Sequence, residues 1–132
     1  MKVIFYSSKK PVDKLVTLIK CAKIHFEKQK PLIFFVTDQE GEQFLDQLLW
    51  QNAAFLPHIV SNDTSDELIL ISRKKELLNN AKYIFNLTSE PLNIPNFQII
   101  YEFDDKADFK KKMLSKKKFT FYHNLKVQIE AK

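Results

Sequence analysis

The chain has few of the residues on which nucleotide-binding loops depend. Its 132 residues include a single glycine. Phosphate-binding loops need several glycines, because the backbone must reach positive φ angles and approach the phosphates without a Cβ in the way. That one glycine, Gly41, falls inside a segment with helical periodicity. We therefore expect neither a dinucleotide-binding loop nor a P-loop.

Cysteine and histidine are also scarce, which argues against other kinds of site. Cys21 is the only cysteine, so an intrachain disulfide is excluded, as suits a reducing compartment. His25, His58 and His123 are far apart, and none has a second His or Cys at metal-ligand spacing. A Gly-x-Ser-x-Gly motif for a serine nucleophile is missing. We expect no catalytic residues, no cofactor and no metal.

Long apolar runs are missing too. The longest, at residues 32–36 and 68–71, have the length of strands, whereas a membrane-spanning helix needs about 18 apolar residues. The N-terminus enters a predicted strand without the basic start and long apolar stretch of a signal peptide. A composition of 45% hydrophobic residues is typical of a folded protein. We expect a single domain over residues 1–132, located in the cytoplasm and not in a membrane.

The chain does contain short apolar runs that alternate with amphipathic segments. Strands are predicted at residues 3–6, 32–36, 68–71, 83–87, 99–103 and 119–122. Helical periodicity predicts helices at 11–29 and 39–51 and a basic helix at about 105–118. Residues 57–66 and 91–96 are the most loop-like. This alternation predicts βαβ units, and hence an α/β fold: a Rossmann-like three-layer sandwich with a mainly parallel sheet.

Trp50 and Phe55 are candidates for a protein-binding surface, which the general α/β pattern does not require. In the predicted helix 39–51, the apolar stripe points roughly 170° away from Trp50, if the helix runs that far; this stripe consists of Phe44, Leu45, Leu48 and Leu49. An exposed Trp beside a Phe is typical of a protein-binding hot spot, since these rings bury much area at low entropic cost. If the helix ends early, Trp50 instead folds back over the edge of the domain.

Positive charge is concentrated near the C-terminus. The net charge is +5, yet residues 106–132 hold nine lysines against two acids, and the remainder holds twelve basic residues against fourteen acids. In the basic helix, Phe109 and Met113 are spaced to face the core, and Lys112 and Lys116 flank them. Such a charge run is often only a solvated face. Its local character also suits an anionic partner: a nucleic acid, a membrane surface or an acidic peptide.

The segment from Phe44 to Trp50, followed by Phe55-Leu56-Pro57-His58, resembles the most characteristic segment of the DNA polymerase III chi subunit family. The shared pattern is a leucine, an acid and a leucine–tryptophan pair, then an aromatic–aliphatic–Pro–His turn. Further similarities are the Phe5-Tyr6 pair, the strand 84–87, the strand that ends at 101–104, the basic helix and Asn124-Leu125. The resemblance covers essentially the whole chain.

This resemblance implies a non-catalytic binding protein. Chi subunits have a Rossmann-like fold without nucleotide-binding activity. They bind the acidic C-terminal tail of single-stranded DNA-binding protein and pair with the psi subunit, which links them to the clamp loader. By position, the resemblance implies a psi interface at Trp50 and Phe55 and a tail-binding site at Lys112 and Lys116. The family often has Arg in place of Lys112 and an aromatic residue in place of Ser115.

A direct nucleic-acid-binding protein remains the alternative. In that case the basic helix, residues 106–118, contacts the phosphates itself. Aromatic residues for base stacking are few in this segment, since Phe119, Phe121 and Tyr122 fit a strand better.

Overall fold

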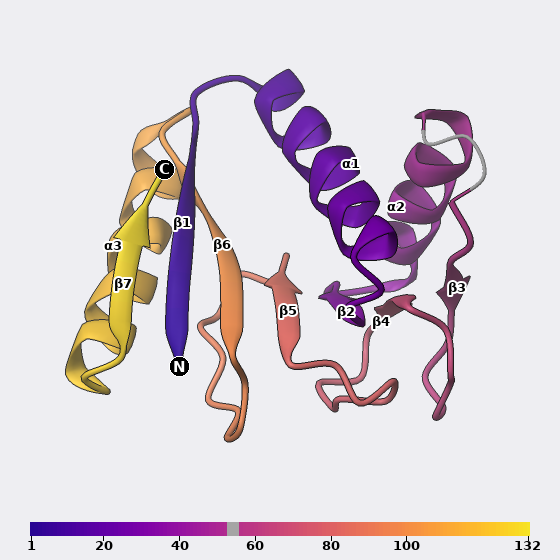
Figure 1. Cartoon of the computed structure of the whole chain (residues 1–132). Coiled ribbons are helices and arrows are strands. Elements are labelled where there is room, and N and C mark those ends of the chain that lie inside the picture. The colour runs from indigo at the N-terminus through magenta and orange to yellow at the C-terminus, as the bar shows by residue number, and fades with distance from the viewer. Residues whose placement is uncertain (53–55) are drawn as a thin grey trace.

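The computed structural model describes residues 1–52 and 56–132, which form one sheet flanked by helices (Figure 1). The elements in chain order are β1 (Lys2–Ser8), α1 (Pro11–Glu27), β2 (Leu32–Phe35), α2 (Gln39–Asn52), β3 (Ile59–Val60), β4 (Ile69–Ser72), β5 (Tyr83–Asn86), β6 (Ile99–Asp105), α3 (Phe109–Asn124) and β7 (Gln128–Ala131). The strand order is β3-β4-β2-β5-β6-β1-β7, and every pair of neighbours is parallel. The predicted α/β fold with a mainly parallel sheet is confirmed.

The helices form layers on both faces of this sheet, as Figure 1 shows. Side chains alternate along each strand, so Ile4 of β1 packs beneath α1 and α2, whereas its neighbours Val3 and Phe5 pack on the α3 side. In β2, Phe34 belongs to the first cluster and Phe35 to the second, and both side chains are fully buried. A strand covered on both faces needs the unbroken apolar run that residues 32–36 provide.

The first two helices begin where the sequence predicts. Pro11 occupies the first position of α1, and the Asp13 carboxylate accepts hydrogen bonds from the backbone N–H groups of Lys9 and Lys10. In α2, the Asp38 carboxylate accepts the N–H of Gly41 at 2.8 Å. A Cβ on Gly41 would lie 3.2 Å from the Cβ of Val36. The single glycine therefore allows α2 to pack closely against the end of β2.

The C-terminal part of the chain differs from the prediction. Residues 119–122, expected as a strand, lie in α3, and the last strand is β7. Helix α3 also starts later than residue 105, after Asp108, whose carboxylate accepts the N–H of Lys111 at 2.8 Å. The buried residues of α3 are Ser115, Lys118 and Tyr122. Because two of these are polar, hydropathy does not reveal the helical period.

Two further expectations about burial were wrong. Phe109 and Met113, expected to face the core, are 78% and 50% exposed, because the opposite side of α3 packs on the sheet. Phe44 is also exposed, while Leu45, Leu48 and Leu49 carry the buried stripe of α2. The segment 57–66 is a loop as expected, except for the short edge strand β3, whose side chains are both exposed and therefore give no burial signal.

Candidate partner-binding surfaces

Trp50 lies in the last turn of α2 and points away from the core. Its side chain is 60% exposed, while Leu48 and Leu49 beside it in the sequence are buried. Helix α2 continues to Asn52, so it does not end before Trp50. Of the two alternatives for Trp50, the structure has the outward-facing one; its role in binding stays a prediction. Phe55, the other residue expected in this surface, lies outside the described residues.

The indole of Trp50 rests on the ring of His58, with 4.4 Å between the ring centroids. The side chain of His58 is fully buried and is held on both sides. Its Nε2 lies 2.9 Å from Oδ1 of Asp46, and its Nδ1 lies 2.9 Å from the carbonyl oxygen of Leu56. Sequence reasoning missed this cluster. The i, i+4 spacing of Asp46 and Trp50, which sets both on one side of α2, was the available signal.

A groove between α3 and the β1–β7 edge of the sheet contains the two predicted lysines. It has a volume of about 280 Å³, and Lys112 and Lys116 both line it. The other lining residues are Phe5, Asp104, Ser115, Phe119, Ile129 and Ala131. The Phe5 and Phe119 rings lie 6.2 Å apart and give this groove an aromatic wall. The structure thus brings Lys112 and Lys116 together beside an apolar surface.

The ammonium groups at this groove are not neutralised by nearby acids. Asp104, which also lines it, pairs with Lys106 at 3.7 Å. Among the residues that the structure describes, Lys112 and Lys116 have no acid within ion-pair distance. The groove therefore presents two free positive charges next to apolar side chains, an arrangement that favours a ligand with carboxylates and an apolar part.

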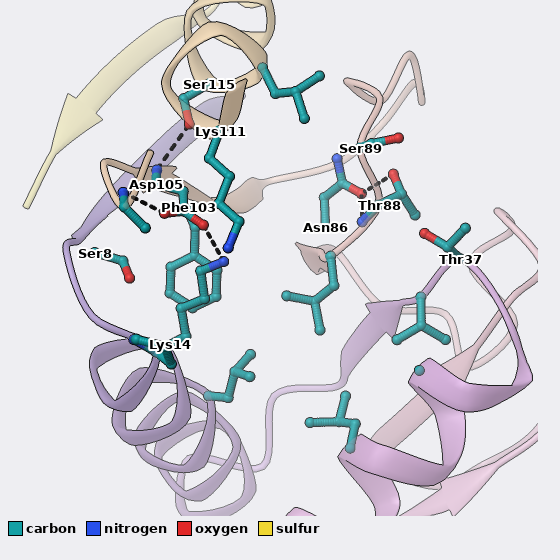
Figure 2. A pocket seen from close by; sticks show the side chains of 18 of the residues that line it. Ser8, Lys14, Thr37, Asn86, Thr88, Ser89, Phe103, Asp105, Lys111 and Ser115 are labelled. Atoms are coloured by element: carbon teal, nitrogen blue, oxygen red, sulfur yellow. Dashed lines mark hydrogen bonds and ion pairs between the residues drawn. The ribbon is translucent and has the colours of Figure 1, made fainter. Parts of the chain in front are cut away.

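A larger cleft, of about 610 Å³, opens at the carboxyl ends of the central strands (Figure 2). Ligands of open α/β sheets commonly bind at this end of the sheet, often with a phosphate at a helix N-terminus. Here each helix N-terminus is already capped by a carboxylate of the chain itself, from Asp13, Asp38 and Asp108. Asp38 and Asp108 each take one first-turn N–H, and Asp13 places a negative charge in the first turn of α1, so all three helix starts are less suited to a phosphate.

Two of the charged side chains that line this cleft, Lys14 and Asp105, are paired with each other. Lys14 forms an ion pair with Asp105, and Lys111 also points toward that carboxylate in Figure 2. Partial burial acts to raise the pKa of Asp105, but hydrogen bonds from Lys14 and the Ala107 N–H, with the charges of Lys14 and Lys111, lower it overall. The Lys14–Asp105 pair thus links α1 to the end of β6.

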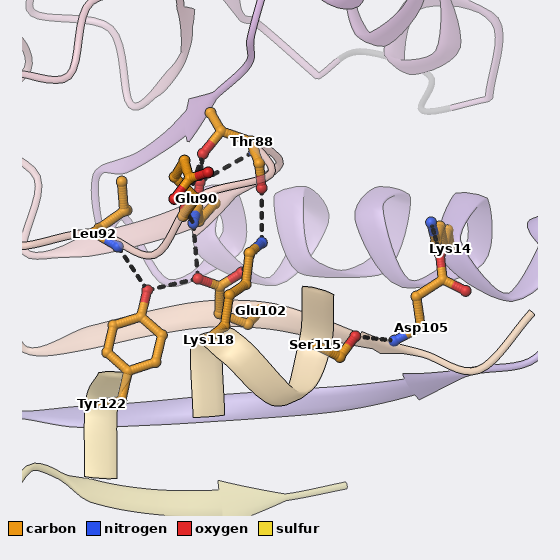
Figure 3. A network of polar contacts seen from close by, with 10 residues as sticks. Lys14, Thr88, Glu90, Leu92, Glu102, Asp105, Ser115, Lys118 and Tyr122 are labelled. Carbon is orange, nitrogen blue, oxygen red and sulfur yellow. Dashed lines mark hydrogen bonds and ion pairs between the residues drawn. The ribbon is translucent and has the colours of Figure 1, made fainter. Parts of the chain in front are cut away.

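Beneath the cleft, a buried polar network joins α3 to the sheet (Figure 3). The fully buried Glu102 carboxylate accepts hydrogen bonds from Lys118 at 2.8 Å, Tyr122 at 2.6 Å and Asn86 at 2.7 Å. Lys118 also donates to the carbonyl oxygen of Thr88 at 2.7 Å. Burial raises the pKa of Glu102, and the three donors act against this. Each donor of the network has a partner, so its role is structural.

The described part of the chain does not support a metal site, a reactive cysteine or a membrane-spanning helix. Within residues 1–52 and 56–132, no three His, Cys, Asp or Glu side chains are grouped to hold a metal ion. Burial raises the pKa of the Cys21 thiol to about 12, which leaves the sulfur protonated and unreactive. Over the same residues, no helix has both the length and the apolar character needed to cross a membrane.

Comparison with known proteins gives the family. The model of the family described as DNA polymerase III chi subunit, HolC, matches residues 1–130 of the 132. The chain belongs to this family. Chi is an accessory subunit of the polymerase that acts in DNA replication, so membership of this family implies protein partners. A search of curated proteins found no matching relative.

The two candidate surfaces of this chi-family chain lie at opposite edges of its sheet. Helix α2, which carries Trp50, contacts β3 and β4 at one edge, whereas α3, which carries Lys112 and Lys116, contacts β6 and β7 at the other. Figure 1 shows α2 and α3 on either side of the molecule. Trp50 thus lies far across the sheet from Lys112 and Lys116.

Proposed function

We propose that this chi-family protein bridges two protein partners. At one surface, the groove with Lys112 and Lys116 binds the acidic C-terminal tail of single-stranded DNA-binding protein. At the other, Trp50 and Phe55 bind the psi subunit, which connects the chain to the clamp loader. The bridge acts in the cytoplasm, performs no catalysis, and meets DNA only through its partners.

The groove between α3 and β7 carries the proposal for the tail. A C-terminal tail of this kind offers several carboxylates and an apolar last residue with a free α-carboxylate. Lys112 and Lys116 supply ammonium groups at the rim, while Phe5, Phe119 and Ile129 supply an apolar floor. Both halves of the tail thus find a complement in one groove. Charges at a rim mainly speed association and make binding sensitive to salt.

The two departures from the family's pattern change how this groove works. Lys112 acts as a point charge, because an ammonium lacks the planar fork with which Arg binds a carboxylate in two places. Ser115 is buried, and its hydroxyl oxygen accepts the N–H of Asp105 at 2.9 Å, so it helps to hold α3 on the sheet. Binding of the tail therefore rests more on general charge attraction than on a fixed geometry at position 112.

Titration of a fluorescent acidic tail peptide tests the groove. Reversal of both charges, in Lys112→Glu/Lys116→Glu, should weaken binding at least about tenfold, since two attractions become repulsions. The matched control is Lys20→Glu/Lys23→Glu, which changes the net charge equally at two exposed positions of α1. It should retain most of the affinity. Equal affinities for wild type and the groove variant would contradict the site, and no binding by wild type would contradict the tail as ligand.

One observation favours the alternative, direct nucleic-acid binding. Phe109 is 78% exposed and Phe119 is 47% exposed, so α3 presents two aromatic rings among its lysines. Such rings can stack on bases, and the lysines can neutralise phosphates. Titration with an oligothymidylate at a series of salt concentrations separates the two functions. Tight binding at low salt that falls steeply with salt would favour the alternative; no binding at low salt would exclude it.

A further inference from the structure

We infer that Asp46 and His58 are positioning residues for the Trp50 surface. They hold the indole in the orientation in which α2 presents it to a partner. The positioning itself is a property of the isolated chain. Its effect on affinity rests on the proposed function, because it assumes that the psi subunit binds at Trp50.

The cluster joins two segments of the chain. Asp46 and Trp50 lie on one side of α2, one turn apart, and His58 reaches between them from the segment that precedes β3. The imidazole lies against the indole with 4.4 Å between the ring centroids, and its Nε2 lies 2.9 Å from Oδ1 of Asp46. His58 is fully buried, Asp46 is 37% exposed and Trp50 is 60% exposed. The exposed ring thus rests on a buried one that is itself tied to the helix.

Hydrogen bonding fixes the plane of the His58 ring. The Leu56 carbonyl oxygen, 2.9 Å from Nδ1, and the Asp46 carboxylate, 2.9 Å from Nε2, are both acceptors. A doubly protonated imidazole donates to both, whereas a neutral ring has one N–H and keeps one of the two contacts. Either form of the ring is therefore held in its plane by at least one of these hydrogen bonds.

A fixed indole lowers the cost of binding. An exposed Trp that moves freely loses rotamer freedom when a partner immobilises it, and this ordering is a recognised cost of association. A ring already held against His58 has lost that freedom before the partner arrives. Loss of the Asp46 carboxylate should therefore weaken binding at Trp50 by about three- to tenfold, although Asp46 does not contact the indole.

The first experiment needs no partner. Trp50 is the only tryptophan, so the time-resolved fluorescence anisotropy of the chain reports on this ring alone. Asp46→Ala, which removes the acceptor, should add fast independent motion of the indole, and Asp46→Glu, which keeps the carboxylate, should add less. The control is Glu40→Ala, which removes an exposed carboxylate from the same helix. Indole motion unchanged in Asp46→Ala would overturn the inference, provided that urea unfolding shows a folded variant.

The second experiment measures affinity for the psi subunit in a double-mutant cycle. Asp46→Ala should cost three- to tenfold in the wild-type chain and nothing further in a Trp50→Ala chain, because its effect passes through the indole. An equal loss in both backgrounds would mean that Asp46 contacts the partner itself, which overturns positioning. If the wild-type chain does not bind psi, the proposed function fails at this surface, and the anisotropy experiment alone then decides the inference.

Discussion

At the scale of single residues, Lys118 behaves unlike its neighbours in α3. Lys116 and Lys117 are exposed, whereas Lys118 is 8% exposed and donates to the buried Glu102 carboxylate and to the Thr88 carbonyl oxygen. A buried ion pair gives little net stability over an apolar pair of the same size. Removal of one partner is costly, because it leaves an uncompensated charge in the core. Of the lysines at 116–118, the one that matters for folding is thus the one that faces the sheet.

Lys118→Met should therefore lower the free energy of unfolding by about 3–5 kcal/mol at pH 8. Lys117→Met is the matched control: Lys117 is exposed, its pair with Glu90 at 3.1 Å lies at the surface, and its loss should cost less than about 1 kcal/mol. Urea unfolding followed by circular dichroism measures both. Similar losses in the two variants would contradict a structural role for the buried pair.

The same variant should respond to pH. Burial raises the pKa of Glu102, and the Lys118 ammonium opposes this rise, so Lys118→Met raises the pKa further. With its pKa higher in the folded than in the unfolded state, Glu102 binds a proton on folding between those two values. The free energy of unfolding should therefore increase as the pH falls through the folded pKa. The deficit of Lys118→Met relative to wild type should shrink between pH 8 and pH 5, and a constant deficit would argue against Glu102 as its source.

At the scale of elements, the scarcity of glycine affects how the helices end. Helices α1 and α3 are each followed, one residue after the C-cap, by a residue with positive φ: Gln29 at 55° and Lys126 at 60°. Glycine is the usual residue at this position, because a Cβ is strained there. In this chain, longer side chains occupy both positions. The turn after Lys126 leads into β7, so it also sets one side of the lysine-lined groove.

Lys126→Gly should raise the free energy of unfolding by about 0.5–1 kcal/mol, since it relieves the strain at positive φ. Lys126→Ala serves as the control, because it removes the same exposed side chain and charge but keeps a Cβ. The urea midpoint should rise for the glycine variant alone. An equal rise for the alanine variant would show that loss of the lysine charge, and not the backbone conformation, is responsible.

At the scale of the whole molecule, the sheet separates the two candidate surfaces. The Trp50 surface lies beside β3, the lysine-lined groove lies beside β7, and five strands stand between these two edges. The central strands are buried on both faces and packed on two hydrophobic clusters. Such a core is rigid, so an event at one edge has no evident route to change the other. The proposed function therefore predicts that two partners occupy the chain at once.

The proposed bridge should thus form a ternary complex without competition. A saturating concentration of the acidic tail peptide should change the affinity of the chain for psi by no more than about twofold, because the two surfaces share no residues. Analytical ultracentrifugation with labelled peptide would detect all three components in one species. Displacement of psi by the peptide, or of the peptide by psi, would contradict separate surfaces.

Much of this arrangement follows from the sequence. The run Leu32–Phe35 predicts a strand buried on both faces, Pro11 marks the start of α1, and the spacing of Leu45, Leu48 and Leu49 turns Trp50 outward. In the strand and in α2, the buried side chains are apolar and lie close together in the chain. The spacing of these apolar residues therefore predicts which face is buried, without knowledge of contacts to distant parts of the chain.

Only the tertiary structure decided the face of α3, the last strand and the support of Trp50. Ser115 and Lys118 are buried because β6 and the residues after β5 supply partners for them, and hydropathy cannot register partners so distant in the chain. Strand β7 lies at the edge of the sheet, so its side chains carry no strong burial pattern. His58 contacts Trp50 only once the chain has turned back beside α2. The sequence predicts burial where the buried residues are apolar. The burial of a polar group depends instead on hydrogen-bond partners that come close only in the folded chain.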